Sequence, residues 1–223
     1  MHRGLTISVV IPAYNEEQGI EAVIRRQPGC VDEIVVANNN STDRTAEVAA
    51  ALGAKVVLET RQGYGAAYKR GLGAATKDVI VTMDADGTYP PEEIPGLLDH
   101  LIDGPLDFIS AARFPLRDPR AMNFSNKVGN WILTTVAWVL FGQRMADSQS
   151  GMWVFRREVL DQLRVESDGM PFSQEIKIEA IRHPEVRFAE HRIRYEPRIG
   201  EVKLRKWRDG WENLRQLVSK RFS

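Results

Sequence analysis

The chain has almost no cysteine, no long apolar run and no excess of charge. Cys30 is the one cysteine among 223 residues, which excludes an internal disulfide and fits a reducing compartment. Lys+Arg and Asp+Glu number 30 each, which argues against a nucleic-acid binder that depends on bulk positive charge. The most apolar stretch, residues 131–142, is shorter than the ~20 residues that span a bilayer. No secretory signal is expected, because a strand-like run begins at Leu5 and leads directly into a motif.

The first half alternates β-branched apolar runs with helical segments. Strands are expected at about 5–11, 32–37, 55–58, 78–83 and 106–110, with helices at about 16–26, 41–52, 63–75 and 91–102. This alternation is typical of α/β proteins whose parallel sheet carries helices on both faces. Ligands bind such sheets beyond the carboxyl ends of the strands.

The second half is less regular. We expect a long helix at 123–141, a strand at 152–155, a helix at 172–181, strands or a hairpin at 186–195 and a terminal helix at 206–221. The helix at 123–141 is apolar almost all round, which favours a core helix over a dimer contact or an interfacial wedge. No repeat or linker divides the chain, so a single domain over 1–223 is expected.

Two aspartates end the fourth expected strand. Asp84 and Asp86 alternate in an extended chain, so their side chains share a face. Two like charges that close repel unless a cation lies between them, and a hard divalent ion bridges carboxylates to substrate phosphates. The alternative is a polar turn after a strand. Further polar clusters follow the first strand (14–17) and the second (38–43), so all three clusters are expected at one edge of the sheet.

Four motifs together carry a family resemblance. Ile11-Pro12-Ala13-Tyr14-Asn15-Glu16-Glu17, Asn38-Asn39-Asn40-Ser41-Thr42-Asp43, Asp84-Ala85-Asp86 and Asp147-Ser148-Gln149-Ser150-Gly151 resemble the family-2 inverting glycosyltransferases with a GT-A fold. The match is closest to the dolichyl-phosphate mannose synthase-like group and covers residues 6–204. It implies a Rossmann-like, mostly parallel sheet, with a nucleotide-binding half at about 1–112 and an irregular acceptor half at about 113–204.

The resemblance also implies roles for individual residues. Those of the nucleotide-sugar site are Pro12, Tyr14, Glu16, Asn38, Asp43, Asp84, Ala85, Arg113 and Lys203. Mg²⁺ or Mn²⁺ is expected at Asp84, Asp86 and Thr88. Asp86, Asp147 and Arg198 are the implied catalytic residues, and Gln149 and Glu175 the implied acceptor contacts. Arginine suits phosphate oxygens because its guanidinium donates two parallel hydrogen bonds.

The implied reaction moves a sugar from a nucleotide-diphosphate sugar to a polyprenyl phosphate. A phosphate monoester needs no general base, because its second pKa lies near ~6. A soluble or glycan hydroxyl acceptor is the alternative, and it would need Asp147 as the base. An alternative of another class is a non-catalytic nucleotide-sugar-binding subunit that partners a membrane protein.

Two positions depart from the family pattern. Asn38 stands where the family usually has aspartate, at the position that meets the base. A carboxylate suits the two adjacent donors of guanine, whereas an amide suits the donor and acceptor of uracil, so a UDP-sugar is favoured over GDP-mannose. Val202 stands where serine is commoner, near the expected acceptor phosphate.

The C-terminal segment is basic and carries two tryptophans. Its cations are Lys203, Arg205, Lys206, Arg208, Arg215, Lys220 and Arg221. Trp207 and Trp211 lie at helical spacing, so residues 205–223 are expected to form a basic amphipathic helix. Such a helix suits an anionic membrane surface. The alternative packs the two tryptophans on the core. The expected location is cytoplasmic, at the inner face of the cytoplasmic membrane.

Overall fold

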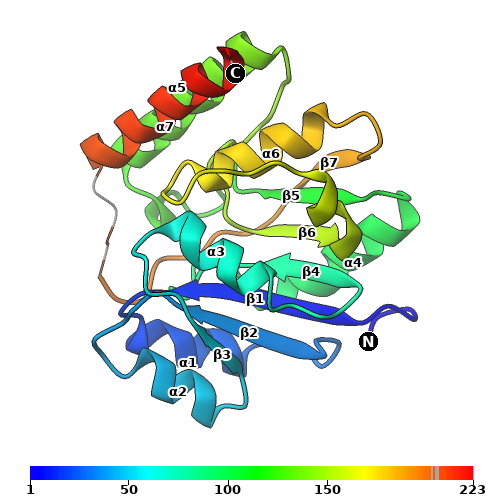
Figure 1. Cartoon of the computed structure of the whole chain (residues 1–223), viewed down its shortest axis with the longest axis vertical. Helices are drawn as coiled ribbons and strands as arrows, with labels where there is room; N and C mark the ends of the chain where they lie inside the picture. Colours follow the sequence, from blue (N-terminus) through cyan, green and yellow to red (C-terminus); the bar gives the residue numbers. More distant parts are fainter. Residues whose placement is uncertain (202, 204–205, 223) are drawn as a thin grey trace.

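A mostly parallel seven-stranded sheet forms the centre of the computed structural model, which describes residues 1–201, 203 and 206–222 (Figure 1). Within these residues the strand order is β3-β2-β1-β4-β6-β5-β7. The strands are β1 (Ile7–Ala13), β2 (Glu33–Asn38), β3 (Lys55–Leu58), β4 (Val79–Thr82), β5 (Phe108–Ala112), β6 (Trp153–Arg156) and β7 (Phe188–Arg192). The expected positions Val202, Leu204 and Arg205 lie outside the described residues.

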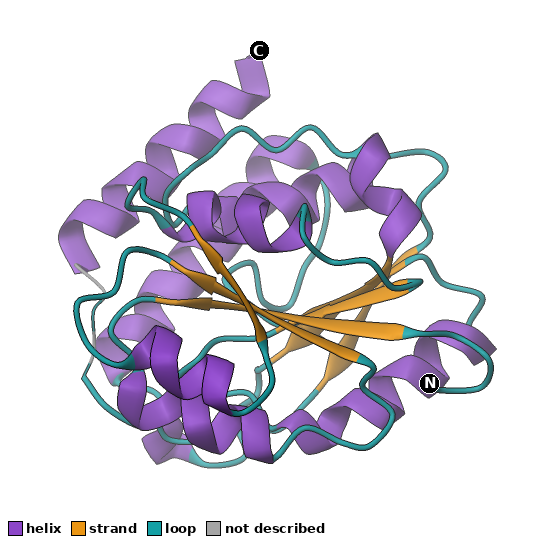
Figure 2. Ribbon diagram, turned by 60° about the horizontal axis from the view of Figure 1, so that its bottom comes forward, coloured by secondary structure: helices purple, strands orange, loops and turns teal. Residues whose placement is uncertain are grey.

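The helices alternate with the strands in the first half, as expected. The α-helices are α1 (Glu17–Arg25), α2 (Thr45–Ala51), α3 (Tyr64–Leu72), α4 (Ile94–Asp103), α5 (Phe124–Phe141), α6 (Phe172–Arg182) and α7 (Lys206–Phe222). Short 3₁₀ turns occupy Pro91–Glu93, Pro119–Ala121 and Arg157–Gln162. Figure 2 shows helices on both faces of the twisted sheet, which confirms the expected α/β class.

Each face of the sheet has its own core. Buried side chains of α1, α2 and α4 pack on one face, among them Ile20, Ala49 and Leu98. Buried side chains of α3 and α6 pack on the other, where the rings of Tyr68 and Phe172 stack 5.5 Å apart. Because helices pack on both faces, the strands that carry the loops at the carboxyl edge are held by a core on each side.

β6 joins the two expected halves of the chain. It lies between β4 and β5 and pairs antiparallel with both, whereas β1, β2, β3 and β4 pair in parallel and so do β5 and β7. Because β6 runs in the opposite direction, the loop that precedes it reaches the edge where β1, β2 and β4 end. The expected strands or hairpin at 186–195 form the single strand β7.

Loop side chains decide how α1 and α2 begin. Asn15, before α1, has a φ of 52°, and its Oδ1 accepts the Thr42 N–H at 2.7 Å. α2 begins at Thr45 rather than after Ser41, because the Asp43 carboxylate accepts the Thr45 N–H at 3.0 Å. The Asn15 contact joins two loops that are distant in sequence, whereas the Asp43 contact is local.

α5 is not a core helix, and the prediction that it is buried was wrong. Trp131 is 68% exposed and Val139 73% exposed, and only Asn130 and Ala137 of this helix are buried. The helix lies at one end of the molecule beside α7 (Figure 1), so a narrow strip of its circumference suffices for packing. The alternative that packs the α7 tryptophans on the core was wrong too, because both are exposed. No helix within the described residues has the length and apolarity to cross a bilayer.

Candidate active site

Four loops meet at the carboxyl edge of the sheet. Three follow β1, β2 and β4, and the fourth precedes β6. We call residues 84–88 the Asp84 loop and residues 147–151 the Asp147 loop. The two touch directly, because a Cβ added at Gly151 would lie 3.2 Å from Asp84 Oδ1 and 2.5 Å from Tyr64 Oη. Glycine at this position therefore permits the close approach that builds the site.

The Asp84 loop presents two carboxylates, of which Asp86 is buried and Asp84 half-buried. Asp84 Oδ1 accepts a hydrogen bond from the Tyr64 hydroxyl at 2.9 Å. Burial, together with the neighbouring charge of Asp86, raises the pKa of Asp84 to about 7. Asp86 Oδ1 accepts the Thr88 N–H at 3.0 Å and the Thr88 hydroxyl at 2.7 Å. The hydroxyl oxygen of Thr88 thus lies beside Asp86, and the pair of carboxylates lies together as expected.

A distant segment brings two cations to this pair. Arg198, 112 residues from Asp86, donates to Asp86 Oδ2 at 2.5 Å and also to Glu16. Lys203 Nζ donates to the Tyr14 carbonyl at 2.6 Å and lies 3.2 Å from Glu16 Oε1. Backbone hydrogen bonds fix the segment, since Glu196 N–H donates to the Thr88 carbonyl at 2.9 Å and Ile199 N–H to the Asp86 carbonyl at 2.8 Å. The structure therefore gathers Glu16, Asp86, Arg198 and Lys203 at one place.

The Nε–H of Arg198 is buried and has no hydrogen-bond partner within the described part of the chain. Unsatisfied buried donors are uncommon in native proteins. The arginine thus neutralises two carboxylates while one of its donors stays unmatched. An anionic ligand at this edge would offer Arg198 oxygen acceptors that the protein itself does not supply.

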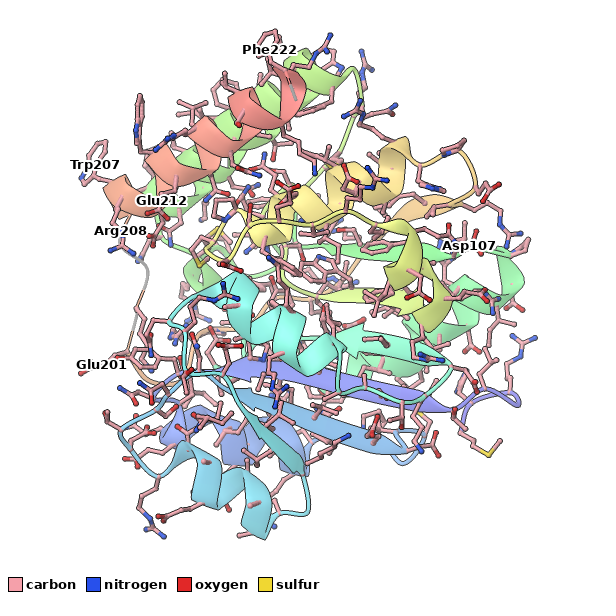
Figure 3. All side chains as sticks on the ribbon, in the orientation of Figure 1. Asp107, Glu201, Trp207, Arg208, Glu212 and Phe222 are labelled. Carbon is pink, nitrogen blue, oxygen red and sulfur yellow. The ribbon has the colours of Figure 1, made fainter. Side chains whose placement is uncertain are left out.

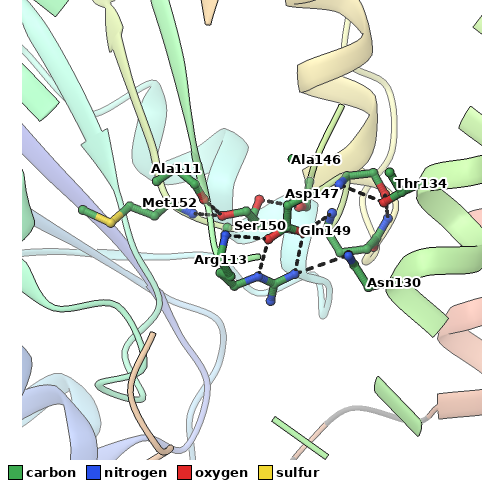
Figure 4. A network of polar contacts seen from close by, with 12 residues as sticks. Ala111, Arg113, Asn130, Thr134, Ala146, Asp147, Gln149, Ser150 and Met152 are labelled. Carbon is green, nitrogen blue, oxygen red and sulfur yellow. Dashed lines mark hydrogen bonds and ion pairs between the residues drawn. The ribbon is translucent and has the colours of Figure 1, made fainter. Parts of the chain in front are cut away.

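Asp147 and Arg113 form a closed pair (Figure 4). Arg113 donates to Asp147 Oδ2 from its backbone at 3.0 Å and from Nε at 2.7 Å, and to Oδ1 from Nη2 at 2.8 Å. Burial alone would raise the pKa of Asp147, but the Arg113 charge outweighs it and holds that pKa below its ordinary value. The carboxylate is fully buried and both its oxygens are engaged. A proton acceptor needs a free lone pair and a pKa near the working pH, so this geometry does not favour Asp147 as a general base.

Lys177 lies beneath the Asp147 loop and was not singled out from the sequence. It is fully buried, and its Nζ donates to the carbonyls of Asp147 at 3.1 Å and Ser150 at 2.9 Å. Burial lowers the pKa of this amine to about 7. Nothing in the sequence marked this lysine, because one lysine in an amphipathic helix is ordinarily a surface residue. It fixes the backbone of the loop that carries Gln149.

The two implied acceptor residues have different surroundings. Gln149 is half-buried, and its Nε2 donates to Gln174 Oε1 at 2.9 Å. Glu175 is buried and accepts the Ser167 N–H at 2.9 Å and the Lys220 amine at 2.9 Å. The contacts of Glu175 thus tie α6 to α7 and to the loop before α6.

The remaining implied nucleotide contacts follow β1, β2 and β4. Pro12 lies within β1 and Ala85 is a buried residue of the Asp84 loop, whereas Tyr14 is 40% exposed. Asn38 Oδ1 accepts the Ser41 N–H at 3.0 Å. Asp43 accepts the Glu17 N–H at 3.1 Å and so joins the loops after β1 and β2.

The donor atoms of the Asp84 loop fit a hard divalent cation. Two neighbouring carboxylates, one with a raised pKa, favour a cation in the same place. No group of three or more acidic, histidine or cysteine side chains in the described ranges is arranged to hold a metal without other ligands. An ion here would therefore need further oxygen atoms, which the phosphates of a bound nucleotide can supply.

Comparisons with known proteins agree on the class of protein. The profile described as Glycosyl transferase family 2 matches residues 8–164. The low-salt glycan biosynthesis hexosyltransferase Agl6 of Haloferax volcanii is 36% identical over 220 residues, which are 96% of this chain and 53% of Agl6. The dolichyl-phosphate hexose transferase of the same organism is 36% identical over 204 residues, 89% of this chain and 86% of the relative. This chain therefore spans only about half the length of Agl6.

One solved structure is similar over nearly the whole chain. It is the glucosyl-3-phosphoglycerate synthase of Mycobacterium tuberculosis in complex with Mn²⁺, UDP and phosphoglyceric acid. The TM-score is 0.77 at 27% identity, and the match covers 98% of this chain and 79% of the synthase.

Proposed function

Since the chain belongs to glycosyl transferase family 2, we propose that it transfers a hexose from a nucleotide-diphosphate sugar to a polyprenyl phosphate, with inversion at the anomeric carbon. The carrying observation is the cluster of Asp84, Asp86, Arg198 and Lys203 at the carboxyl edge of the sheet. Two carboxylates and two cations within one site suit a metal-bound diphosphate. The relative named as a dolichyl-phosphate hexose transferase supports the class of acceptor.

Mg²⁺ or Mn²⁺ would be held by Asp84 and Asp86, with Thr88 beside them. Bound there, the ion would neutralise charge on the leaving diphosphate. The side chains of the protein act with it. Arg198 and Lys203 meet the negative charge that develops as the sugar–phosphate bond breaks. Tyr14 offers an exposed ring face for the base, and Glu16 orients Arg198 through their ion pair.

The state of Asp147 favours a phosphate acceptor over a hydroxyl acceptor. A hydroxyl nucleophile must lose its proton to a base, whereas a phosphate monoester is already ionised at neutral pH. Asp147 forms an ion pair with Arg113 that engages both carboxylate oxygens, and its pKa is lowered. Its role is therefore to hold the loop that carries Gln149. Gln149 then positions the acceptor or the sugar. The alternative reaction, on a soluble or glycan hydroxyl, would need the Arg113 pair to open.

The preferred donor is a UDP-sugar. Asn38 Oδ1 accepts the Ser41 N–H. At the base position that the resemblance implies, its Nδ2 would donate to a base carbonyl and the second lone pair of Oδ1 would accept the uracil N3–H. The structurally similar synthase was crystallised with UDP and Mn²⁺, which supports the same choice. Titration with UDP and GDP tests this part, and tighter binding of GDP contradicts it.

A donor panel tests the proposal as a whole. Purified protein is incubated with UDP- and GDP-sugars, Mn²⁺ or Mg²⁺, and a water-soluble short-chain polyprenyl phosphate, and the products are identified by mass. Transfer to the phosphate, abolished by a chelator, is the expected result. The matching polyprenol, which has a hydroxyl in place of the phosphate, serves as the control acceptor. Transfer to polyprenol but not to its phosphate refutes the acceptor, and nucleotide binding without any turnover refutes the enzyme.

A polyprenyl acceptor also implies a place of action. The lipid chain stays in the bilayer while nucleotide sugars are dissolved in the cytoplasm, so the protein would work at the inner face of the cytoplasmic membrane. Either a peripheral contact with lipid or a membrane-protein partner would hold it there.

A further inference from the structure

α5 and α7 expose most of the tryptophan of this protein. The two helices pack together at one end of the molecule through Ala137 and Leu217, with Ile178 of α6 between them (Figure 1). Four of the five tryptophans lie on these helices, and their exposed fractions are 68% for Trp131, 42% for Trp138, 93% for Trp207 and 68% for Trp211. The fifth, Trp153, is fully buried in β6. A concentration of exposed aromatic side chains in one place marks an interaction surface.

The exposed apolar residues form a stripe along each helix. On α7 they are Trp207, Trp211, Val218 and Phe222, spaced by four, seven and four residues, which places them on one face. Figure 3 shows Trp207 and Phe222 at the two ends of α7, both directed away from the body of the protein. On α5 the exposed apolar residues are Phe124, Val128, Trp131, Ile132, Trp138 and Val139, which also share one face. We call these two stripes the aromatic surface.

Basic residues accompany the aromatic surface. Residues 119–146 contain three basic and no acidic residues, and residues 206–222 contain five basic and two acidic ones. Since the whole chain has no net charge, the rest of the protein is acidic. Arg215 and Arg221 are exposed on α7, and the Arg144 guanidinium lies 4.9 Å from the centre of the Trp138 ring. Positive charge is therefore concentrated on the surface that exposes tryptophan.

This combination fits a lipid surface better than a protein partner. Charged residues are depleted from the cores of protein interfaces, whereas here arginines alternate with the aromatic residues on the same helices. Tryptophan favours the headgroup level of a bilayer, and clustered Lys and Arg favour anionic lipid. We propose that α5 and α7 dock on an anionic bilayer, with the tryptophans at headgroup depth and the arginines on lipid phosphates. The proposal rests on the proposed function in that a lipid acceptor requires such docking.

The aromatic surface is joined to the candidate active site by direct contacts. Thr134 of α5 bonds Ser148 of the Asp147 loop, with 2.9 Å between their hydroxyl oxygens and 3.1 Å from the Ser148 N–H to Thr134 Oγ1. Asn130 of α5 lies 3.5 Å from Arg113. A docked bilayer would thus bring lipid phosphates next to the loop that carries Gln149. No other part of the described chain combines exposed tryptophan with an approach to this loop.

Vesicle sedimentation tests the docking surface. The unmodified protein is expected to bind vesicles of phosphatidylglycerol and phosphatidylcholine and to stay in solution with phosphatidylcholine alone. Trp207→Ala with Trp211→Ala should weaken binding by about tenfold or more, because the apolar contact is lost. Arg215→Gln with Arg221→Gln should weaken it by about fivefold for each arginine at low salt. Matched controls are Leu58→Ala, 53% exposed at the end of β3, and Arg44→Gln, 76% exposed before α2; both should bind like the unmodified protein.

Tryptophan fluorescence gives a second readout. Brominated lipids should quench the emission of the exposed tryptophans but leave the contribution of Trp153. Trp131→Phe should remove part of the quenched signal if α5 docks together with α7. Equal binding by the double variants and the unmodified protein overturns the proposal. So does a dimer that forms with rising concentration and protects the tryptophans while vesicles are not bound.

The outcome is independent of the test of function. Transfer to the short-chain acceptor needs no vesicle, so transfer without vesicle binding refutes only the docking. Vesicle binding without transfer to any acceptor refutes only the proposed function.

Discussion

The Asp84 loop and the Asp147 loop lie in contact at one edge of the sheet, yet their carboxylates meet opposite electrostatic conditions. Asp147 pairs with the buried guanidinium of Arg113, whose charge lowers the pKa of the carboxylate. Asp84 faces a tyrosine hydroxyl and a second carboxylate, and its pKa is raised to about 7. Burial acts to raise the pKa of both side chains, so the opposite directions of the two shifts come from their charged partners.

The contrast separates a carboxylate that holds the local fold from one whose surroundings would favour a bound cation. A buried ion pair with every lone pair engaged holds the local fold and is costly to break. A buried carboxylate that lacks a full complement of positive charge gains when a cation arrives from outside. The same residue type, six residues before β6 in one loop and two residues after β4 in the other, therefore has two different environments.

Breaking the Asp147 pair should have the largest effect. Arg113→Met leaves a buried charge without its partner and should lower the free energy of unfolding by about 3–5 kcal/mol. Urea unfolding followed by circular dichroism measures this loss. The control is Arg187→Met, which removes a similar two-point contact to Asp107 from a side chain that is 57% exposed. A loss for Arg113→Met no greater than that of the control would show that the pair does not hold the loop.

Neutralising either carboxylate of the Asp84 loop should lower turnover without lowering stability. Asp84→Asn or Asp86→Asn should lower kcat by about 10²–10³, the scale of losing one charge-stabilising contact. At pH 8 without metal, Asp84→Asn should raise stability. The pKa of Asp84 is about 7 in the folded protein and about 3.9 in the unfolded chain, so stability falls as the pH rises between these values, and the full cost is present at pH 8. Near-normal turnover in both variants contradicts the assignment of the metal site.

Lys177, beneath the Asp147 loop, should make the free energy of unfolding depend on pH. Its pKa is about 7 in the folded protein and about 10.4 in a free chain, so between these values the unfolded state binds one more proton. Stability should therefore rise with pH over this range, by at most about 1.4 kcal/mol per unit, and fall again as the pH returns to 7. Lys177→Met should remove this rise relative to the unmodified protein. An unchanged slope, with Lys55→Met as the surface control, would show that the amine stays charged under the loop.

Arg198 should have the smallest effect and the most specific one. It already neutralises Asp86 in the protein alone, so Arg198→Met should raise Mn²⁺ affinity in the absence of nucleotide by about five- to tenfold. The same change should weaken UDP binding, because a phosphate contact is lost. Water-proton relaxation measures Mn²⁺ without any turnover. Weaker Mn²⁺ binding in the variant would mean that Arg198 organises the site and does not compete with the ion.

The sequence predicted those parts of the site that depend on local order. The alternation of strands and helices placed the loops after β1, β2 and β4 at one edge, and the structure brings Asp84, Asp86, Glu16, Arg198 and Lys203 together there. The ion pair between Asp147 and Arg113 could not be predicted from the sequence, because it depends on β6 lying between β4 and β5. The exposure of α5 was also missed, since an apolar helix looks alike in the core and at an interface.

The place of β6 in the sheet constrains how the molecule can be made. β4 and β5 emerge from the ribosome well before β6, the strand that must separate them, so both wait with an unpaired edge. Until residue 156 is available, the centre of the sheet stays open and exposed to wrong pairing with other chains. A fragment ending near residue 112 would lack β6, so the edges of β4 and β5 would stay unpaired. We therefore expect it to aggregate, so the candidate active site should not form without the rest of the chain.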